Sequence, residues 1–223
     1  MGPGSLSSFF SGPGGRFRVA VVAGVSLLVL GGAGWLAYHL WGSGADAESP
    51  EACLQRIEKI ETPKSESQVQ ELREYARHVD VRVSVSAVRK LGEAKTQASR
   101  QALVELMRDS PQPQVRGEAA AALGKDPAAD SKLLVQVLQT DKDAEARAGA
   151  AKGLARLKDQ MTVPVLYEKL RDPDQKVRIW AATALSNITG ARFDYRAEVP
   201  PDQQKDKIDY IGVLLRRWGM LKT

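Results

Sequence analysis

The chain is poor in cysteine, histidine and aromatic residues, and each shortage excludes a class of protein. Its 223 residues include one cysteine, Cys53, so neither an intramolecular disulfide nor a multi-cysteine metal site can form. The two histidines, His39 and His78, are too few for a histidine metal site. Aromatic residues make up 6% of the chain although 43% is hydrophobic. This balance favours helices packed through alanine and leucine over a β-sandwich.

Recognisable catalytic motifs are also missing. The sequence contains no GxSxG, HExxH, P-loop or GxGxxG segment. We therefore expect a protein that is not an enzyme, with no catalytic residue, cofactor, metal or small-molecule substrate. Lys and Arg number 32 and Asp and Glu 27, for a net charge of +5, and the charges are interspersed. Interspersed charge indicates solvated helix faces, so no nucleic-acid partner is expected.

One long apolar run is present, at residues 19–41, after a Gly-, Ser- and Pro-rich tail at residues 1–18. His39 is its only ionisable residue, and 23 helical residues would span roughly 34 Å, enough for a hydrocarbon core of about 30 Å. The sequence therefore predicts one transmembrane helix, followed by a linker at residues 42–49. Small residues near one face of this helix are candidates for contact with another membrane helix: Ala20, Gly24, Gly31 and Gly34.

The flanking charges predict the orientation of this helix. Arg16 and Arg18 precede it, and acidic residues follow it. The positive-inside bias predicts a bacterial inner-membrane protein with a cytoplasmic N-terminus and a periplasmic C-terminal part. Two alternatives remain open: a signal peptide cleaved at Ala45-Asp46-Ala47, and the inverse topology with a cytoplasmic C-terminal part.

An alanine-rich segment recurs at a nearly fixed distance. The leucines that close its four copies are 32, 31 and 31 residues apart: Leu91, Leu123, Leu154 and Leu185. Alanine stands four residues before each of them, and Val or Ala eight residues before. These positions share one face of a helix. A second helix follows, marked by Leu103, Leu134 and Val165, and a degenerate first copy occupies residues 50–79.

The pattern predicts an all-α protein, an α-solenoid of four to five helix pairs preceded by the transmembrane helix. The solenoid should cover residues 50–190. A loop and a capping helix should follow at residues 191–223.

The segments DPDQKVRIWAATALSNI and PQVRGEAAAALGKD resemble the HEAT-repeat family, in the short bacterial form related to phycobilin lyases. The resemblance covers residues 80–190 well and residues 50–79 weakly. The resemblance implies that the solenoid binds other proteins. Together with the predicted membrane helix, this leads us to expect a membrane-anchored scaffold that binds a protein partner, as an accessory subunit of a membrane complex. The alternative is a lyase-like or cofactor-maturation and assembly factor. A second cysteine and an aromatic-rich pocket sequence are both missing, which argues against chromophore chemistry.

Two sets of residues are candidates for specific roles. The first is a structural ladder between repeats, with an anion-binding array as its alternative: Arg116, Arg147 and Arg178 with Asp109, Asp141 and Asp172. The second is a partner-binding face on the second helices, expected to form the inner face of the solenoid: Gln101, Glu105, Arg108, Gln136, Gln139 and Arg171.

Overall fold

The structure is a computed structural model that describes residues 48–63 and 65–222, all within the compact unit Glu48–Thr223. The tail predicted at residues 1–18, the membrane helix predicted at residues 19–41 with its small-residue face, and most of the linker lie outside the described residues. Within the described ranges, no helix is long and apolar enough to cross a membrane.

The described ranges contain ten α-helices and three short 3-10 helices, and no strand. The α-helices are α2 (Pro50–Lys59), α3 (Glu66–Tyr75), α4 (Val81–Ala94), α5 (Gln97–Asp109), α6 (Pro113–Leu123), α7 (Ser131–Thr140), α8 (Ala144–Leu157), α9 (Val163–Glu168), α10 (Gln175–Thr189) and α11 (Lys205–Arg217). The 3-10 helices are η1 (Gln160–Thr162), η2 (Lys169–Arg171) and η3 (Pro201–Gln204).

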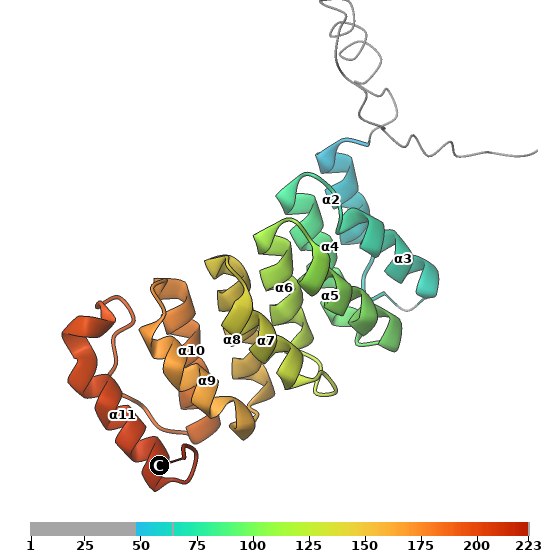
Figure 1. The fold of residues 1–223 in the computed structure, drawn as a ribbon. Coiled ribbons are helices and arrows are strands. Elements are labelled where there is room, and N and C mark those ends of the chain that lie inside the picture. Colours follow the sequence, from blue (N-terminus) through green and yellow to red (C-terminus); the bar gives the residue numbers. More distant parts are fainter. Residues whose placement is uncertain (1–47, 64, 223) are drawn as a thin grey trace, which may run out of the picture. The chain divides into compact units, whose positions relative to one another are not determined.

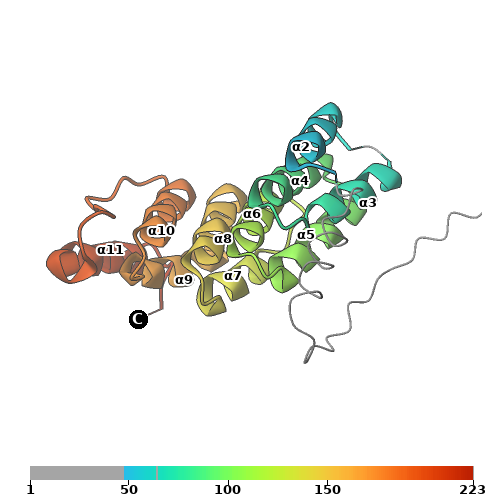
Figure 2. The ribbon, with the colours of Figure 1, turned by 90° about the horizontal axis from the view of Figure 1, so that it is seen from above.

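The helices form two rows (Figures 1 and 2). The alanine-rich helices α4, α6, α8 and α10 pack against one another in succession, with α2 against α4. The second helices α5, α7 and α9 lie alongside, and α5 packs on α6, α7 on α8 and α9 on α10. Each repeat therefore contacts mainly its neighbours, as in an α-solenoid.

The repeated residues form the core between the two rows. All four closing leucines and all four column alanines are fully buried. The alanine column brings the row of alanine-rich helices close together, and glycines bring α6 and α8 closer still. A methyl group added to Gly149 would lie 2.1 Å from the carbonyl oxygen of Gly117. Because no side chain separates the two helices there, they touch backbone to backbone.

The two ends of the solenoid are built differently. At the N-terminal end, Arg56 occupies the alanine column of α2 and is exposed, while Cys53 and Ile57 face the core. At the C-terminal end, α10 stops at Gly190, which has a positive φ of 71°. A loop then leads to α11, whose Ile208, Ile211 and Leu215 join the core. Each terminal helix therefore turns an apolar side to the stack. The outward side of α2 is polar, whereas that of α11 also exposes Tyr210 and Val213.

Candidate functional site

Buried arginines link consecutive repeats. Arg147 in α8 donates from Nη1 to the carbonyl oxygens of Asp141 and Lys142 in its own turn, at 3.1 and 3.0 Å. Its Nε and Nη2 donate to the carboxylate of Asp172 in the next turn, at 3.0 and 2.9 Å. Arg116 in α6 repeats this geometry one repeat earlier, with Asp141 as its acceptor at 2.8 and 2.9 Å. The sequence-predicted residues thus meet across repeats, through bidentate ion pairs.

These arginines change the ionisation of their acceptors. Burial is the largest single influence on the pKa of Asp172 and raises it. The hydrogen bonds from Arg147 and from the backbone N–H of Asp174, together with the charges of Arg147 and Lys169, outweigh burial and hold that pKa below its usual range. For Asp141, burial is likewise opposed by Arg116, the backbone N–H of Asp143 and the charge of Arg147, which together lower its pKa. Both carboxylates are therefore charged at neutral pH and act as fixed acceptors.

The first rung of this ladder is neutral. Ser84 stands where the later repeats have arginine, and Gln112 stands in the turn that would supply the acid. The Ser84 hydroxyl donates to Oε1 of Gln112 at 2.9 Å. Nε2 of Gln112 reaches back to the carbonyl oxygens of His78 and Val79, at 3.0 and 3.1 Å. These carbonyls occupy the same positions in their turn as the ones that Arg147 contacts in its own turn. Relative to the later repeats, Ser84 has thus replaced the arginine, and Gln112 contacts both Ser84 and these carbonyls.

The last rung ends on the backbone. Nε and Nη2 of Arg178 both donate to the carbonyl oxygen of Ala197, at 3.0 and 2.7 Å. This acceptor comes from the loop after α10, because no further turn follows to provide an aspartate. The remaining candidate, Asp109, is exposed at the end of α5 and forms no ion pair among the described residues. Its turn places Ser110 and Gln112 where the other turns have aspartates.

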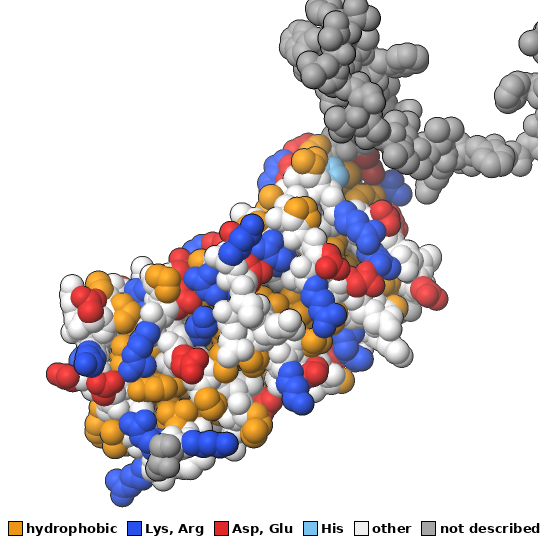
Figure 3. Space-filling view, in the orientation of Figure 1, with side chains coloured by type: hydrophobic (Ala, Val, Ile, Leu, Met, Phe, Trp, Pro, Cys, Tyr) orange, Lys and Arg blue, Asp and Glu red, His pale blue; other side chains and the backbone are white. Residues whose placement is uncertain are grey.

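The residues predicted to bind a partner are all exposed on the second helices and η2. They do not line one common hollow. Gln101 borders a small hollow beside Thr96, whereas Arg108 and Gln136 border another between α5 and α7. Glu105 is ion-paired with Arg73, and Arg171 contacts Asp209 at 2.9 Å. Figure 3 shows side chains of both charges interspersed on this face.

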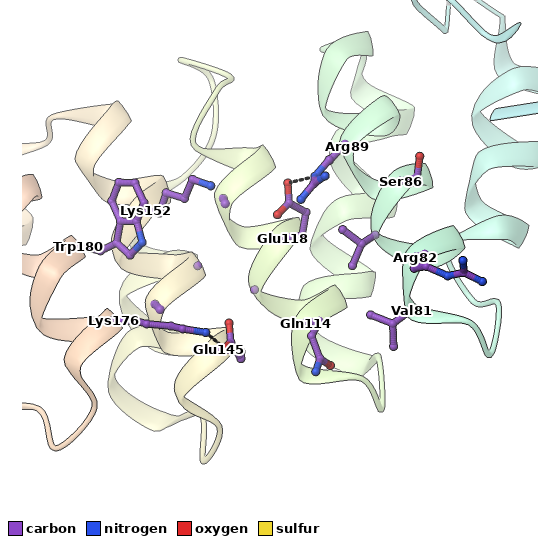
Figure 4. A pocket seen from close by; sticks show the side chains of 15 residues that line it. Val81, Arg82, Ser86, Arg89, Gln114, Glu118, Glu145, Lys152, Lys176 and Trp180 are labelled. Carbon is purple, nitrogen blue, oxygen red and sulfur yellow. Dashed lines mark hydrogen bonds and ion pairs between the residues drawn. The ribbon is translucent and has the colours of Figure 1, made fainter. Parts of the chain in front are cut away.

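A further hollow lies on the other row, and sequence reasoning missed it. It has a volume of about 520 Å³ and is lined by α4, α6, α8 and α10 (Figure 4). We call it the inner groove. Its floor consists of small residues: Gly117, Ala121, Ala148 and Gly149. Val81 and Val85 stand at its α4 side and Trp180 at its α10 side. The signal for this hollow in the sequence is the run of small residues next to the buried alanine column, a pattern that also indicates close helix packing.

Charged side chains border the inner groove. Arg89 of α4 donates from Nε to Glu118 of α6 at 3.0 Å, and Lys176 of α10 is ion-paired with Glu145 of α8. Nζ of Lys152 lies 5.3 Å from the centroid of the Trp180 ring, a cation–π contact. The arrangement is suited to holding a polypeptide by shape and charge.

The remaining groups of chemical interest serve the fold. Cys53 is buried, and desolvation raises the pKa of its thiol, which opposes nucleophilic reactivity. Nδ1 of His78 accepts a hydrogen bond from the backbone N–H of Asp80 at 2.9 Å. Among the described residues, no three His, Cys, Asp or Glu side chains cluster as metal ligands would.

Stacked helix pairs tied by an arginine ladder define an α-solenoid with a groove across four of its helices. The sequence model of the HEAT repeats matches residues 41–124 and 131–196, which is more than half of the chain, and the chain belongs to this family. No curated protein is similar enough in sequence to count as a relative.

One similar solved structure is the complex of CpcE and CpcF of phycocyanin lyase from Nostoc sp. PCC7120. The identity is 16%, the match covers 66% of this chain and 69% of that chain, and the TM-score is 0.45. A likeness of this size carries no argument about function.

Proposed function

We propose that this chain is a membrane-anchored HEAT-repeat scaffold that binds a protein partner as an accessory subunit of a membrane complex, without catalysis of its own. The observation that carries the proposal is the inner groove, an open hollow formed jointly by the four alanine-rich helices α4, α6, α8 and α10. A groove built across repeats presents a long surface, which suits a polypeptide better than a small molecule.

The location rests on the sequence. The apolar run at residues 19–41 is long enough to anchor the chain, and Arg16 and Arg18 favour a cytoplasmic N-terminus. The solenoid would then lie on the periplasmic side of a bacterial inner membrane. A reporter that is active only in the cytoplasm, fused after Thr223, tests this orientation. Activity of this reporter would contradict the proposed orientation and indicate the inverse topology.

Site-specific photocrosslinking in native membranes tests partner binding. A photoreactive amino acid is placed in the full-length chain at Ser86 in the inner groove, or at Gln139 on the second helices. Gln160, which is exposed in η1 and is neither a groove-lining residue nor one of the predicted partner-binding residues, is the control position. We expect a discrete adduct, identified by mass spectrometry, from at least one test position and none from Gln160. An absence of adducts from both test positions contradicts the proposed function.

A further inference from the structure

We propose that the inner groove receives an amphipathic helix of the partner, with large apolar side chains on one face and carboxylates along its flanks. This inference rests on the proposed function and specifies the chemistry of the partner. It also moves the expected binding surface from the second helices to the alanine-rich helices.

The floor of the groove favours large apolar side chains. Ala121 and Ala148 are almost fully buried, and Gly117 and Gly149 bring α6 and α8 into backbone contact. No long side chain can project from these positions, so the floor stays open between the higher walls. Large side chains from a partner would fill this space and remove apolar surface from water.

The walls supply apolar contacts at both sides of the floor. Val81 is 38% exposed at the start of α4, and Val85 is partly buried one turn later. Trp180 is partly buried on α10, opposite Val81 across the floor (Figure 4). A partly exposed tryptophan at the edge of a hollow is a typical anchor for binding.

The rim favours carboxylates. The cationic side chains of Arg82, Arg89 and Lys176 are 64%, 61% and 62% exposed. The lining carboxylates are more covered: Glu118 is 20% exposed and Glu145 45%. An approaching chain therefore meets positive charge first.

Arg89 on the rim and Lys152, a further cation that lines the groove, have donors to spare. Arg89 contacts Glu118 only through Nε, so its two terminal nitrogens remain available to a second carboxylate. Lys152 has no carboxylate partner in the described part of the chain, and only the ring of Trp180 lies against it. Carboxylates on a partner helix could pair with both without displacing an existing bond.

The apolar floor also favours a helix over an extended segment. An extended chain laid on Gly117, Ala121, Ala148 and Gly149 would present its backbone N–H and C=O groups to a surface whose own backbone is already hydrogen-bonded within helices. A helix satisfies its backbone internally and offers side chains at i, i+3, i+4 and i+7.

Defined peptides test this chemistry. The full-length chain is placed in nanodiscs of neutral lipid and titrated against three fluorescent helical peptides of about 16 residues, with empty nanodiscs as the blank. The peptides share one leucine face and differ in their flanks, which carry glutamate, lysine or glutamine. Fluorescence anisotropy should show that the glutamate peptide binds about tenfold more tightly than the lysine peptide, with glutamine between them.

Variants of the chain locate the binding site. Lys152→Glu should weaken the glutamate peptide about fivefold and strengthen the lysine peptide, because it reverses one charge that lines the groove. Lys132→Glu is the matched control, because it makes the same charge change at a residue that is exposed on α7 and lies outside the inner groove. It should leave all three affinities unchanged. Trp180→Ala should weaken all three peptides about tenfold, with circular dichroism verifying that the variant is folded.

Equal affinities for the three peptides, no measurable binding, or equal effects of Lys152→Glu and Lys132→Glu would overturn the inference. These outcomes are distinct from failure of the proposed function. Crosslinked adducts without peptide binding would support the scaffold function and contradict the proposal that the partner binds through an acidic amphipathic helix. Peptide binding without adducts in membranes would support the groove chemistry and contradict the scaffold role.

Discussion

At the scale of single residues, the stability of this solenoid depends on arginines whose three guanidinium nitrogens all donate hydrogen bonds in a place that little water reaches. The side chain of Arg147 is 12% exposed and that of Asp172 is 3% exposed. Ion pairs this deep give little net gain over apolar residues of the same shape, but losing one partner leaves the other charge buried. The ladder therefore adds little net stability, but substitution of one member of a pair is expected to be strongly destabilising.

Arg147→Ala should lower the free energy of unfolding by about 3 kcal/mol, because Asp172 would lose its bidentate donor and keep Lys169 at 3.7 Å as its charged partner, with the backbone N–H of Asp174 at 3.0 Å. Chemical denaturation monitored by circular dichroism measures the loss. Ser84→Ala is the matched control at the neutral rung, where removal of one neutral hydrogen bond should cost about 1 kcal/mol. Equal losses at the two rungs would contradict a structural role for the charged pair.

The ladder also predicts how stability depends on pH. The pKa values of Asp141 and Asp172 are lowered in the folded chain, so the unfolded chain takes up protons first as the pH falls. Their contribution to stability is complete above the unfolded pKa of about 3.9 and is lost as the pH falls through the lower folded values.

Asp172→Asn should therefore flatten the loss of stability below about pH 4. Denaturant unfolding of both proteins between neutral and acidic pH measures this slope. Asp109→Asn, in an exposed residue outside the ladder, serves as the control and should leave the slope as in the parent chain. Parallel slopes for Asp172→Asn and the parent chain would show that Asp172 does not stabilise the fold through its charge.

At the scale of helices, spacing between α6 and α8 is determined by glycine. Gly149→Ala should destabilise the chain by about 3 kcal/mol or more, because its methyl group would lie 2.1 Å from a backbone oxygen that cannot move alone. Gly212→Ala in α11 is the matched control, since its methyl group would meet the side-chain hydroxyl of Tyr167 at 2.4 Å. The tyrosine can rotate away, so thermal melts should show a smaller loss at Gly212.

Much of this helix scale could be predicted from the sequence. The step of 31 or 32 residues placed the four closing leucines in register, and also Arg116, Arg147 and Arg178, because a repeat imposes the same local environment on each copy. The inner groove could not be predicted in this way. In the sequence, Gly117 and Ala148 are indistinguishable from residues that only pack helices together. The three-dimensional arrangement of the helix row is needed to see that they also form the floor of the inner groove.

The exchange of partners at Ser84 and Gln112 was also beyond the sequence pattern. The missing arginine was visible as an exception in the column, but the compensating amide lies 28 residues later, in a turn that keeps no acid at that position. Recognising the pair requires knowing that each rung reaches forward into the following turn. That direction is a property of how repeats stack and is not encoded in the residue types of one repeat.

At the scale of the whole described solenoid, stability should spread between neighbouring repeats and fall toward both ends. Helices α6 and α8 have alanine-rich neighbours on both sides, whereas α2 and α11 lie at the ends of the stack. Amide hydrogen exchange should therefore be slowest in α6 and α8 and fastest in α2 and α11. Equal protection along the chain would mean that the solenoid unfolds as one unit.

The ladder makes this gradient directional. Arg147 connects α8 to Asp172 in the turn before α10. Arg178 of α10 then connects that helix to the carbonyl oxygen of Ala197 in the following loop. Arg147→Ala should therefore speed amide exchange in α10 and α11 and leave α4 close to the parent chain, because only the interface after α8 loses its charged link. Gln112→Ala cuts the neutral rung instead and should speed exchange mainly in α2, α3 and α4. If both substitutions raised exchange everywhere, coupling between repeats would extend along the whole solenoid, and a partner bound in the inner groove would stabilise its ends as strongly as its centre.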